Sequence, residues 1–241
     1  MKPLYMIEMS LDPIALHKFL HLQGYAGRPE DVDFGYGVHA WLGAAFGLLA
    51  PKPWRLFMDR RRPPRLLGYA SHDADELREY MAAFADPVAA RVCGVSGDIA
   101  SKAMPFIGAG RSLGFEVLCC PVGRKTGSGI EKDIFLIAAD NTETDELDRA
   151  SVYCKWILER LEQRGVSVSS VELSGFRHVR QMRQTSRVDG KRRVRYLIRP
   201  HAEFRGILTV TDPEGFRELL MTGVGRHRAF GYGMILLRPV M

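Results

Sequence analysis

The chain has 241 residues, 46% of them hydrophobic, and a formal net charge of +6 at pH 7. This length fits one large domain or two of about 120 residues each, and the lack of any uninterrupted apolar run of about 18 residues excludes ordinary membrane-spanning helices. Because the N-terminal residues do not resemble a signal peptide, we expect a cytoplasmic protein with no membrane association.

The first half of the chain alternates between strand-like and helix-like segments. The elements expected there, in chain order, are a strand over 3–11, a helix over 13–22, a loop over 24–35, a helix over 36–50, strands over 53–59 and 65–70, a helix over 71–86 and a strand over 112–122. Acidic residues lie just before 36–50 and in the first turn of 71–86, where they favour a helix start. Residues 87–111 are rich in Gly, Ala and Ser and give no assignment.

The second half repeats this pattern without alignable sequence similarity. Residues 123–132 are rich in glycine and charge, which is typical of a linker. The elements expected after them are a strand over 133–140, a helix over 146–165, strands over 166–182, 191–199 and 203–211, a helix over 212–223 and a strand over 232–239. The expected fold class is therefore α+β, with two tandem ferredoxin-like (RRM-like, split βαβ) domains over 1–122 and 133–241.

Four cysteines follow none of the spacings typical of zinc sites or disulfide frameworks: Cys93, Cys119, Cys120 and Cys154. We interpret them as small apolar core residues. The sequence thus indicates no metal site and no small-molecule cofactor.

Positive charge is concentrated in one window, residues 176–206, which holds ten Lys and Arg against one Asp and one Glu. The rest of the chain therefore sums to −2. A concentrated basic patch indicates a polyanionic partner, although a solvated charged hairpin gives the same composition. Because alternate strand residues share a face, Arg193 and Arg195 are expected on one face, and Arg177 on the face opposite Arg180.

Tyr36 and His39 lie three residues apart on the helix expected over 36–50, so both side chains project from one face. Histidine titrates near neutral pH and suits general acid or base chemistry. The spacing alone equally fits two packing residues. His17 and His21, four residues apart, suit a metal pair, but no carboxylate or Cys partner is evident, so we interpret them as helix surface.

A glycine-rich segment, residues 223–233 (GVGRHRAFGYG), precedes the last expected strand. Its glycines suit positive φ angles or a close approach of the backbone to another group. Together with Arg226 and Arg228 they suit a phosphate-binding platform, while a simple turn before a strand is the alternative. The order of elements and the lack of Gly-Lys-Ser/Thr exclude Rossmann and P-loop sites.

The glycine-rich segment and the preceding FRGILTVTDPEGFRELLMTGVG resemble the C-terminal part of the RAMP superfamily of CRISPR RNA-binding proteins. YGVHAWL resembles the Tyr-x-x-His motif of its repeat-RNA processing branch from type I-E Cascade. WRLFMDRRRPPRLLGYAS and RASVYCKWILERLEQRG are similar to further elements of that branch, so the resemblance covers most of the chain.

The resemblance implies a metal-independent endoribonuclease that binds the CRISPR repeat hairpin and cleaves precursor crRNA at its 3′ base. Attack by a 2′-OH would leave a 2′,3′-cyclic phosphate, and the protein would remain bound as a Cascade-type subunit. His39 and Tyr36 are the catalytic residues that it implies. A catalytically silent RNA-binding RAMP subunit stays open, because Ala44 and Ala45 stand where some relatives carry a lysine. An RNA-binding module outside CRISPR is a third alternative, although aromatic RNP strands are not evident.

The residues expected to bind RNA are basic side chains of the 177–195 hairpin, of the linker and of the glycine-rich segment. They are Arg177, Arg180, Arg183, Arg187, Lys191, Arg192, Arg193, Arg195, Arg124, Lys125, Arg226 and Arg228, together with the loop glycines Gly223, Gly225, Gly231 and Gly233. The expected partners are the repeat RNA hairpin and other Cascade subunits.

Overall fold

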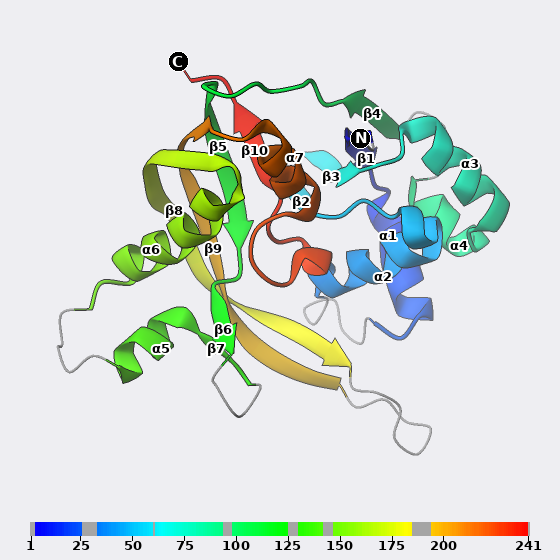
Figure 1. The fold of residues 1–241 in the computed structure, drawn as a ribbon. Helices are drawn as coiled ribbons and strands as arrows, with labels where there is room; N and C mark the ends of the chain where they lie inside the picture. Colours follow the sequence, from blue (N-terminus) through cyan, green and yellow to red (C-terminus); the bar gives the residue numbers. More distant parts are fainter. Residues whose placement is uncertain are drawn as a thin grey trace. The chain divides into compact units, whose positions relative to one another are not determined.

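The computed structural model describes residues 3–25, 33–59, 61–93, 98–124, 130–141, 147–184 and 194–240. The chain divides into two compact units, each assembled from separated segments. The first unit comprises Met1–Pro105, Arg180–Leu197 and Ala229–Gly231, and the second comprises Phe106–Val179, Ile198–Arg228 and Tyr232–Met241. Figure 1 labels the helices and strands of both units.

The first unit contains a four-stranded antiparallel sheet in the order β2-β3-β1-β4. Its strands are β1 (Tyr5–Ser10), β2 (Trp54–Asp59), β3 (Arg62–Ala70) and β4 (Ile99–Ala103). Its helices are α1 (Pro13–Leu22), α2 (Phe34–Phe46), α3 (Ala74–Phe84) and α4 (Pro87–Ala90), with short 3₁₀ turns at Gly47–Leu49 and Arg91–Cys93. This order is that of a ferredoxin-like sheet, as expected.

The core of the first unit lies between one face of this sheet and its helices. Alternation along β1 buries Ile7 and Met9 on the same face. Helix α2 contributes Val38, Trp41 and Leu42 to the same cluster. Because that side of α2 is buried, its opposite side is left to carry residues that are not needed for packing.

The second unit contains a four-stranded sheet in the order β10-β5-β9-β8. Its strands are β5 (Ser112–Cys119), β8 (Val166–Gln184), β9 (Val194–Val210) and β10 (Ile235–Arg238), and β6 (Val122–Arg124) pairs with β7 (Glu131–Asp133) in a separate ribbon. Its helices are α5 (Ile134–Asp140), α6 (Arg149–Leu161) and α7 (Pro213–Thr222), with 3₁₀ turns at Glu162–Arg164 and Arg228–Phe230. Trp156 of α6 stacks on Phe204 of β9, with ring centroids 6.4 Å apart.

The strand that we expected to end the first domain belongs to the second sheet instead. β5 pairs with β9 and β10. The fourth strand of the first sheet is β4, which lies in the stretch left unassigned. Four of its five residues are exposed, so it lacks the apolar alternation by which a strand is recognised.

Residues 133–140, expected as a strand, form helix α5. Asp133 is its N-cap and accepts a hydrogen bond from the Phe135 N–H at 2.8 Å. A short apolar run fits a strand or a helix equally well, and here the cap decides for the helix. The expected linker over 123–132 contributes to the paired strands β6 and β7.

The strands expected over 191–199 and 203–211 are one continuous strand, β9, which begins at Val194. The predicted break between the two strands, at Pro200 and His201, was wrong. Proline within a run is typical of a strand edge or break, but here the strand continues through it. The long hairpin of β8 and β9 is drawn in yellow and orange in Figure 1. The last residues of β8 and the first residues of β9, within Arg180–Leu197, group with the first unit.

Cys93, Cys119 and Cys120 are buried, in keeping with their interpretation as packing residues. Burial raises the pKa of the Cys93 thiol to about 12, which disfavours the reactive thiolate. Among the described residues, no helix has both the length and the apolar character needed to cross a bilayer.

Candidate functional site

Tyr36 and His39 project from the side of α2 that faces away from the core. Asp33 caps the helix by accepting a hydrogen bond from the Tyr36 N–H at 3.1 Å. His39 is exposed and Tyr36 is half-buried. The opposite side of the helix is fixed by Trp41, whose indole N–H donates to the Ala89 carbonyl at 3.0 Å. The imidazole is thus accessible on a rigidly packed helix.

Phe230 of the glycine-rich segment contacts both of these side chains. Its ring meets the His39 ring edge to face, with centroids 4.9 Å apart. It also stacks on the Tyr36 ring, with centroids 6.0 Å apart and planes inclined by 15°. Phe230 follows His39 by nearly 200 residues in the sequence. It nevertheless forms one aromatic group with Tyr36 and His39 within the first unit.

Two glycines allow this approach. A Cβ on Gly35 would lie 2.9 Å from the Phe230 carbonyl oxygen, and a Cβ on Gly231 would lie 2.8 Å from the Trp54 ring. The Trp54 indole N–H also donates to the Ala229 carbonyl at 3.2 Å. Since neither glycine has room for a side chain, the Ala229–Gly231 stretch is held tightly against β2 and α2 of the first unit.

The loop glycines Gly223, Gly225, Gly231 and Gly233 all have positive φ angles, between 70° and 87°. His227 between them also has a positive φ, 62°, and among the described residues it is the only such residue other than glycine. The conformational reason expected for the glycines is therefore met.

Glu131 of β7 gathers basic side chains from two other parts of the second unit. Its Oε1 lies 3.0 Å from Arg226 Nε, and its Oε2 lies 2.9 Å from His227 Nε2 and 3.1 Å from Arg199 Nη2. Arg199 Nη1 also donates to the Glu131 carbonyl at 3.0 Å. Partial burial alone would raise the pKa of Glu131, but the charges of His227, Arg199 and Arg226 outweigh it and hold that pKa below its usual range.

Of the other expected loop and linker residues, Arg228 donates to the Thr222 carbonyl at 2.6 Å, at the C-terminal end of α7. This contact satisfies a helix carbonyl that has no partner within the helix. Arg124 is exposed and lies opposite Glu131 in the β6–β7 register. Lys125 lies outside the described residues.

The basic hairpin places Arg177 and Arg180 in different surroundings. Arg177 Nη2 lies 3.4 Å from Nε2 of His201 in the second unit. The Arg180 guanidinium lies over the Tyr196 ring in the first unit, 3.9 Å from its centroid. Both arginines are exposed. Arg187, Lys191, Arg192 and Arg193, and the side chains of Arg183 and Arg195, lie outside what the structure describes.

The strand that carries Arg180 is tied to the helix that carries His39. The second carboxylate oxygen of Asp33 accepts a hydrogen bond from the Met182 N–H at 2.7 Å. One carboxylate therefore caps α2 and also fixes the backbone of β8 two residues after Arg180, within the first unit.

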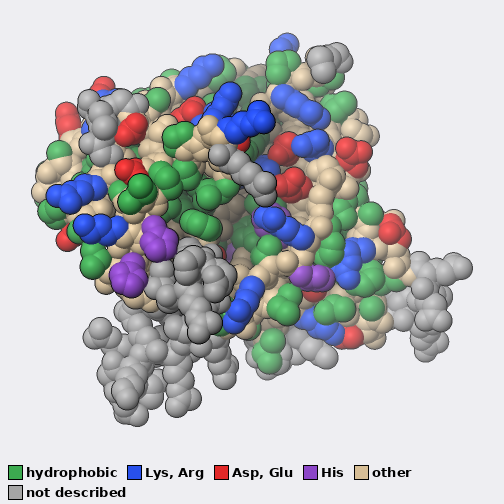
Figure 2. Space-filling model, turned by 180° about the vertical axis from the view of Figure 1, so that it is seen from behind, with side chains coloured by type: hydrophobic (Ala, Val, Ile, Leu, Met, Phe, Trp, Pro, Cys, Tyr) green, Lys and Arg blue, Asp and Glu red, His purple; other side chains and the backbone are tan. Residues whose placement is uncertain are grey.

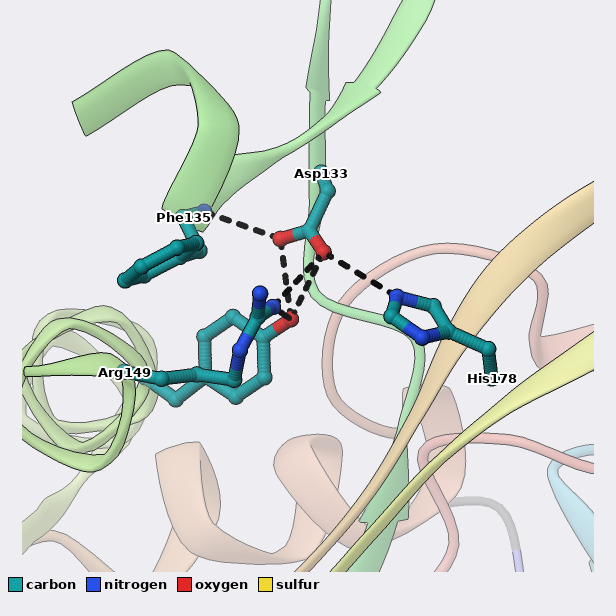
Figure 3. Close-up of polar contacts among 5 residues, drawn as sticks. Asp133, Phe135, Arg149 and His178 are labelled. Atoms are coloured by element: carbon teal, nitrogen blue, oxygen red, sulfur yellow. Dashed lines mark hydrogen bonds and ion pairs between the residues drawn. The ribbon is translucent and has the colours of Figure 1, made fainter. Parts of the chain in front are cut away.

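Asp133 is a buried carboxylate that contacts His178 of β8 together with residues of α5 and α6 (Figure 3). Its two oxygens lie 2.9 Å from the Tyr153 hydroxyl, and Oδ2 lies 3.1 Å from Arg149 Nη1 and 4.0 Å from His178 Nε2. Arg149 also lies over the Phe135 ring, 3.9 Å from its centroid. Burial, together with the hydrogen bond and charge of Asp133, raises the pKa of Tyr153, so its hydroxyl stays a donor.

Charged side chains of both signs are interspersed on the face shown in Figure 2. Ion pairs between described residues include Arg65 with Glu8 at 3.2 Å in the first unit, and Arg205 with Glu116 at 3.1 Å in the second unit. His17 and His21 are exposed on α1, as expected for helix surface. Among the described residues, no group of His, Cys, Asp and Glu has a geometry that would hold a metal ion.

Sequence reasoning did not single out Asp33, Glu131, Arg199, His227 or Phe230 as site residues. The F in GRHRAFGYG was the available signal for Phe230, since an aromatic residue among glycines has little else to pack on. Asp33 was recognisable as a helix-start residue, but its bond to Met182 and the basic partners of Glu131 carried no signal, because only the tertiary structure brings these groups together.

A family model described as "CRISPR associated protein" matches residues 4–239. A comparison with the sequences of characterised proteins gives no match.

Solved structures similar to this chain include Thermus thermophilus Cse3 bound to an RNA that represents a pre-cleavage complex (19% identity, TM-score 0.62) and Cas6e from Escherichia coli K-12 (14%, 0.54). A chain of a CRISPR RNA-guided surveillance complex in a pre-nicking state is also similar (16%, 0.57). Each match covers 98% of this chain and 100% of the other. At these identities the likeness shows a shared fold. Because the family match spans nearly the whole sequence, the protein belongs to the family of CRISPR-associated proteins.

Proposed function

We propose that this protein is a metal-independent endoribonuclease that cleaves precursor CRISPR RNA at the 3′ base of the repeat hairpin. The observation that carries the proposal is the group formed by His39, Tyr36 and Phe230 on a fold shared with the CRISPR endoribonuclease Cse3. An exposed imidazole on a rigid helix suits proton transfer, and the flanking aromatic rings restrict its orientation.

The cleavage step needs two proton transfers. The ribose 2′-oxygen forms a bond to the adjacent phosphorus as its proton leaves, and the bond to the 5′-oxygen breaks as that oxygen gains a proton. The products are a 2′,3′-cyclic phosphate and a 5′-hydroxyl. We assign His39 to one of these transfers as general acid or base, and Tyr36 to holding the 2′-OH or a phosphate oxygen.

RNA binding is assigned to the basic hairpin and to the glycine-rich segment. Arg177 and Arg180 are exposed on the hairpin, and Arg226 is exposed enough to reach a phosphate while it remains paired with Glu131. Guanidinium groups bind phosphate through several N–H donors at once. Similarity to a chain of the surveillance complex supports a further assignment, retention of the cleaved RNA as a subunit of a Cascade-type assembly.

The test is cleavage of a synthetic repeat RNA in EDTA by the wild type, His39→Ala and His17→Ala. Loss of a general acid or base lowers rates by about 10²–10⁴-fold, so His39→Ala should cut at least about 100-fold more slowly. His17→Ala removes an exposed histidine of α1 and should cut at the wild-type rate.

Three results would contradict the proposal. If the wild type cuts only when a metal is supplied, metal independence is wrong. If His39→Ala cuts at full rate, the assignment of His39 is wrong. If all three proteins bind the repeat tightly and none cuts, the protein is an RNA-binding subunit without catalytic activity.

A further inference from the structure

Glu131 is an acid beside Arg226 and Arg124, two of the residues that we assign to RNA. Arg226 and His227 of the glycine-rich segment and Arg199 of β9 all contact its carboxylate at 2.9–3.1 Å. Arg124 is its cross-strand neighbour in the β6–β7 ribbon. A carboxylate repels the phosphates of RNA. Its position beside arginines that we assign to RNA therefore indicates a role other than direct attraction of RNA.

The conformation of His227 gives one reason. A φ of 62° is unfavourable for a residue with a Cβ, because the Cβ approaches the following carbonyl. The imidazole is nevertheless held, with only 8% of the side chain exposed and Nε2 at 2.9 Å from Glu131 Oε2. The contact with Glu131 thus stabilises a backbone geometry that histidine would otherwise avoid.

The placement of Arg226 gives the second reason. Its Nε lies 3.0 Å from Glu131 Oε1, and 39% of its side chain is exposed, against 10% for Arg199. Arg226 is therefore the guanidinium of this cluster with the greater access to solvent. The contact with Glu131 orients the guanidinium group of Arg226. The positive φ of the next residue, His227, sets the direction of the backbone that carries it.

We propose that Glu131 is a positioning residue for RNA recognition, which holds His227 in its left-handed conformation and directs Arg226 toward a phosphate of the repeat RNA. This inference rests on the proposed function, because it takes the glycine-rich segment to contact RNA. A positioning role predicts a different result from a role in which Glu131 only adds negative charge. Without the carboxylate, general attraction of RNA should increase while selective binding of the repeat should fall.

The experiment compares Glu131→Gln with Glu116→Gln, both in the His39→Ala background so that RNA is not cut. Glu116 is a matched control, because it also pairs with an arginine, Arg205, at 3.1 Å in the second unit. The probes are the repeat hairpin and a scrambled RNA of equal length. Glu131→Gln should weaken binding of the hairpin about tenfold and leave binding of the scrambled RNA unchanged or tighter, whereas Glu116→Gln should leave the ratio of the two affinities unchanged.

Equal changes for both RNAs, or no change for the hairpin, would overturn the inference. If the parent protein binds neither RNA, the proposed function fails, and the RNA-positioning role fails with it. If the repeat binds tightly and selectively both with and without Glu131, the positioning role is wrong and the proposed function still holds.

A second measurement tests the contact with His227 without RNA. Glycine adopts a positive φ freely, whereas alanine retains the strain and loses the imidazole. His227→Gly should therefore melt at a higher temperature than His227→Ala. Glu131→Gln should also lower the melting temperature less in the His227→Gly background than in the wild type. Equal losses in the two backgrounds would show that Glu131 does not hold His227.

Discussion

The candidate catalytic residue His39 depends on an aromatic partner from the other end of the chain. Phe230 meets the imidazole edge to face and stacks on Tyr36, and Gly35 and Gly231 are small where the segment that carries it packs. Aromatic pairs of this kind contribute about 0.5–1.5 kcal/mol beyond the area that they bury. For a reacting group the orientation of the ring matters more than this stabilisation, since general acid–base catalysis requires a well-placed proton.

Replacing Phe230 should therefore impair cleavage more than RNA binding. Phe230→Ala is expected to slow single-turnover cleavage about tenfold or more, with a small change in RNA affinity. Phe84→Ala is the control, because Phe84 also belongs to an aromatic pair in the first unit, with Tyr80, and its side chain is exposed. A Phe230→Ala protein that cuts as fast as Phe84→Ala would show that the ring does not orient His39.

Among the secondary-structure elements, α2 and β8 both bond to the side chain of Asp33. Asp33 accepts hydrogen bonds from the N–H groups of Tyr36 in α2 and Met182 in β8. The strand that carries Arg180 and the helix that carries His39 are thus fixed to one carboxylate. At an ordinary N-cap, such as Asp12 of α1, the hydrogen bonds that the side chain accepts from described residues come from the helix that it begins, through the N–H groups of Ile14 and Ala15.

Asp33→Ala and Asp12→Ala should therefore differ in activity more than in stability. Loss of a cap costs about 0.5–2 kcal/mol, so both variants should lower the free energy of unfolding measured with urea. Asp33→Ala should in addition slow RNA cleavage, because β8 loses its link to the helix of His39, whereas Asp12→Ala should cleave at the wild-type rate. Equal activities at matched folded fractions would contradict this coupling.

At the scale of the whole molecule, the first unit is completed by segments that follow it in sequence, Arg180–Leu197 and Ala229–Gly231. Asp133 and Glu131 also connect segments that are far apart in the sequence. Asp133 joins α5, α6 and β8, and Glu131 joins β7, β9 and the glycine-rich segment. Because the pKa of Glu131 is lowered in the folded protein, we expect its protonation to change the global stability.

The depressed pKa of Glu131 sets the sign of that response. A carboxyl whose pKa is lower in the folded protein stabilises it at pH values above its usual pKa, and this contribution is lost as the pH falls through the folded value. The difference in unfolding free energy between wild type and Glu131→Gln should thus shrink as the pH falls below about 4.5. Urea unfolding at several pH values measures it, and a difference that stays constant with pH would contradict the expectation.

The sequence by itself determined the two ferredoxin-like patterns, most helix positions and the pairing of Tyr36 with His39 on one face. These follow from local periodicity, caps and spacing, which act over a few residues. It also singled out the glycine-rich segment, because positive φ angles leave a direct mark on residue choice. It misassigned α5 and placed β5 with the wrong sheet, because short apolar runs have no decisive period and strand pairing is not a local property.

Only the tertiary structure decided which residues meet. Phe230 reaches His39 from across the sequence, Asp33 reaches Met182, and Glu131 collects Arg199, Arg226 and His227. Glu131 lies in the stretch predicted to be a linker. From the sequence alone, its carboxylate cannot be distinguished from one that is exposed to solvent. Its partners come from strands and loops far along the chain, so its role is fixed by the folding of the chain and not by its neighbours in sequence.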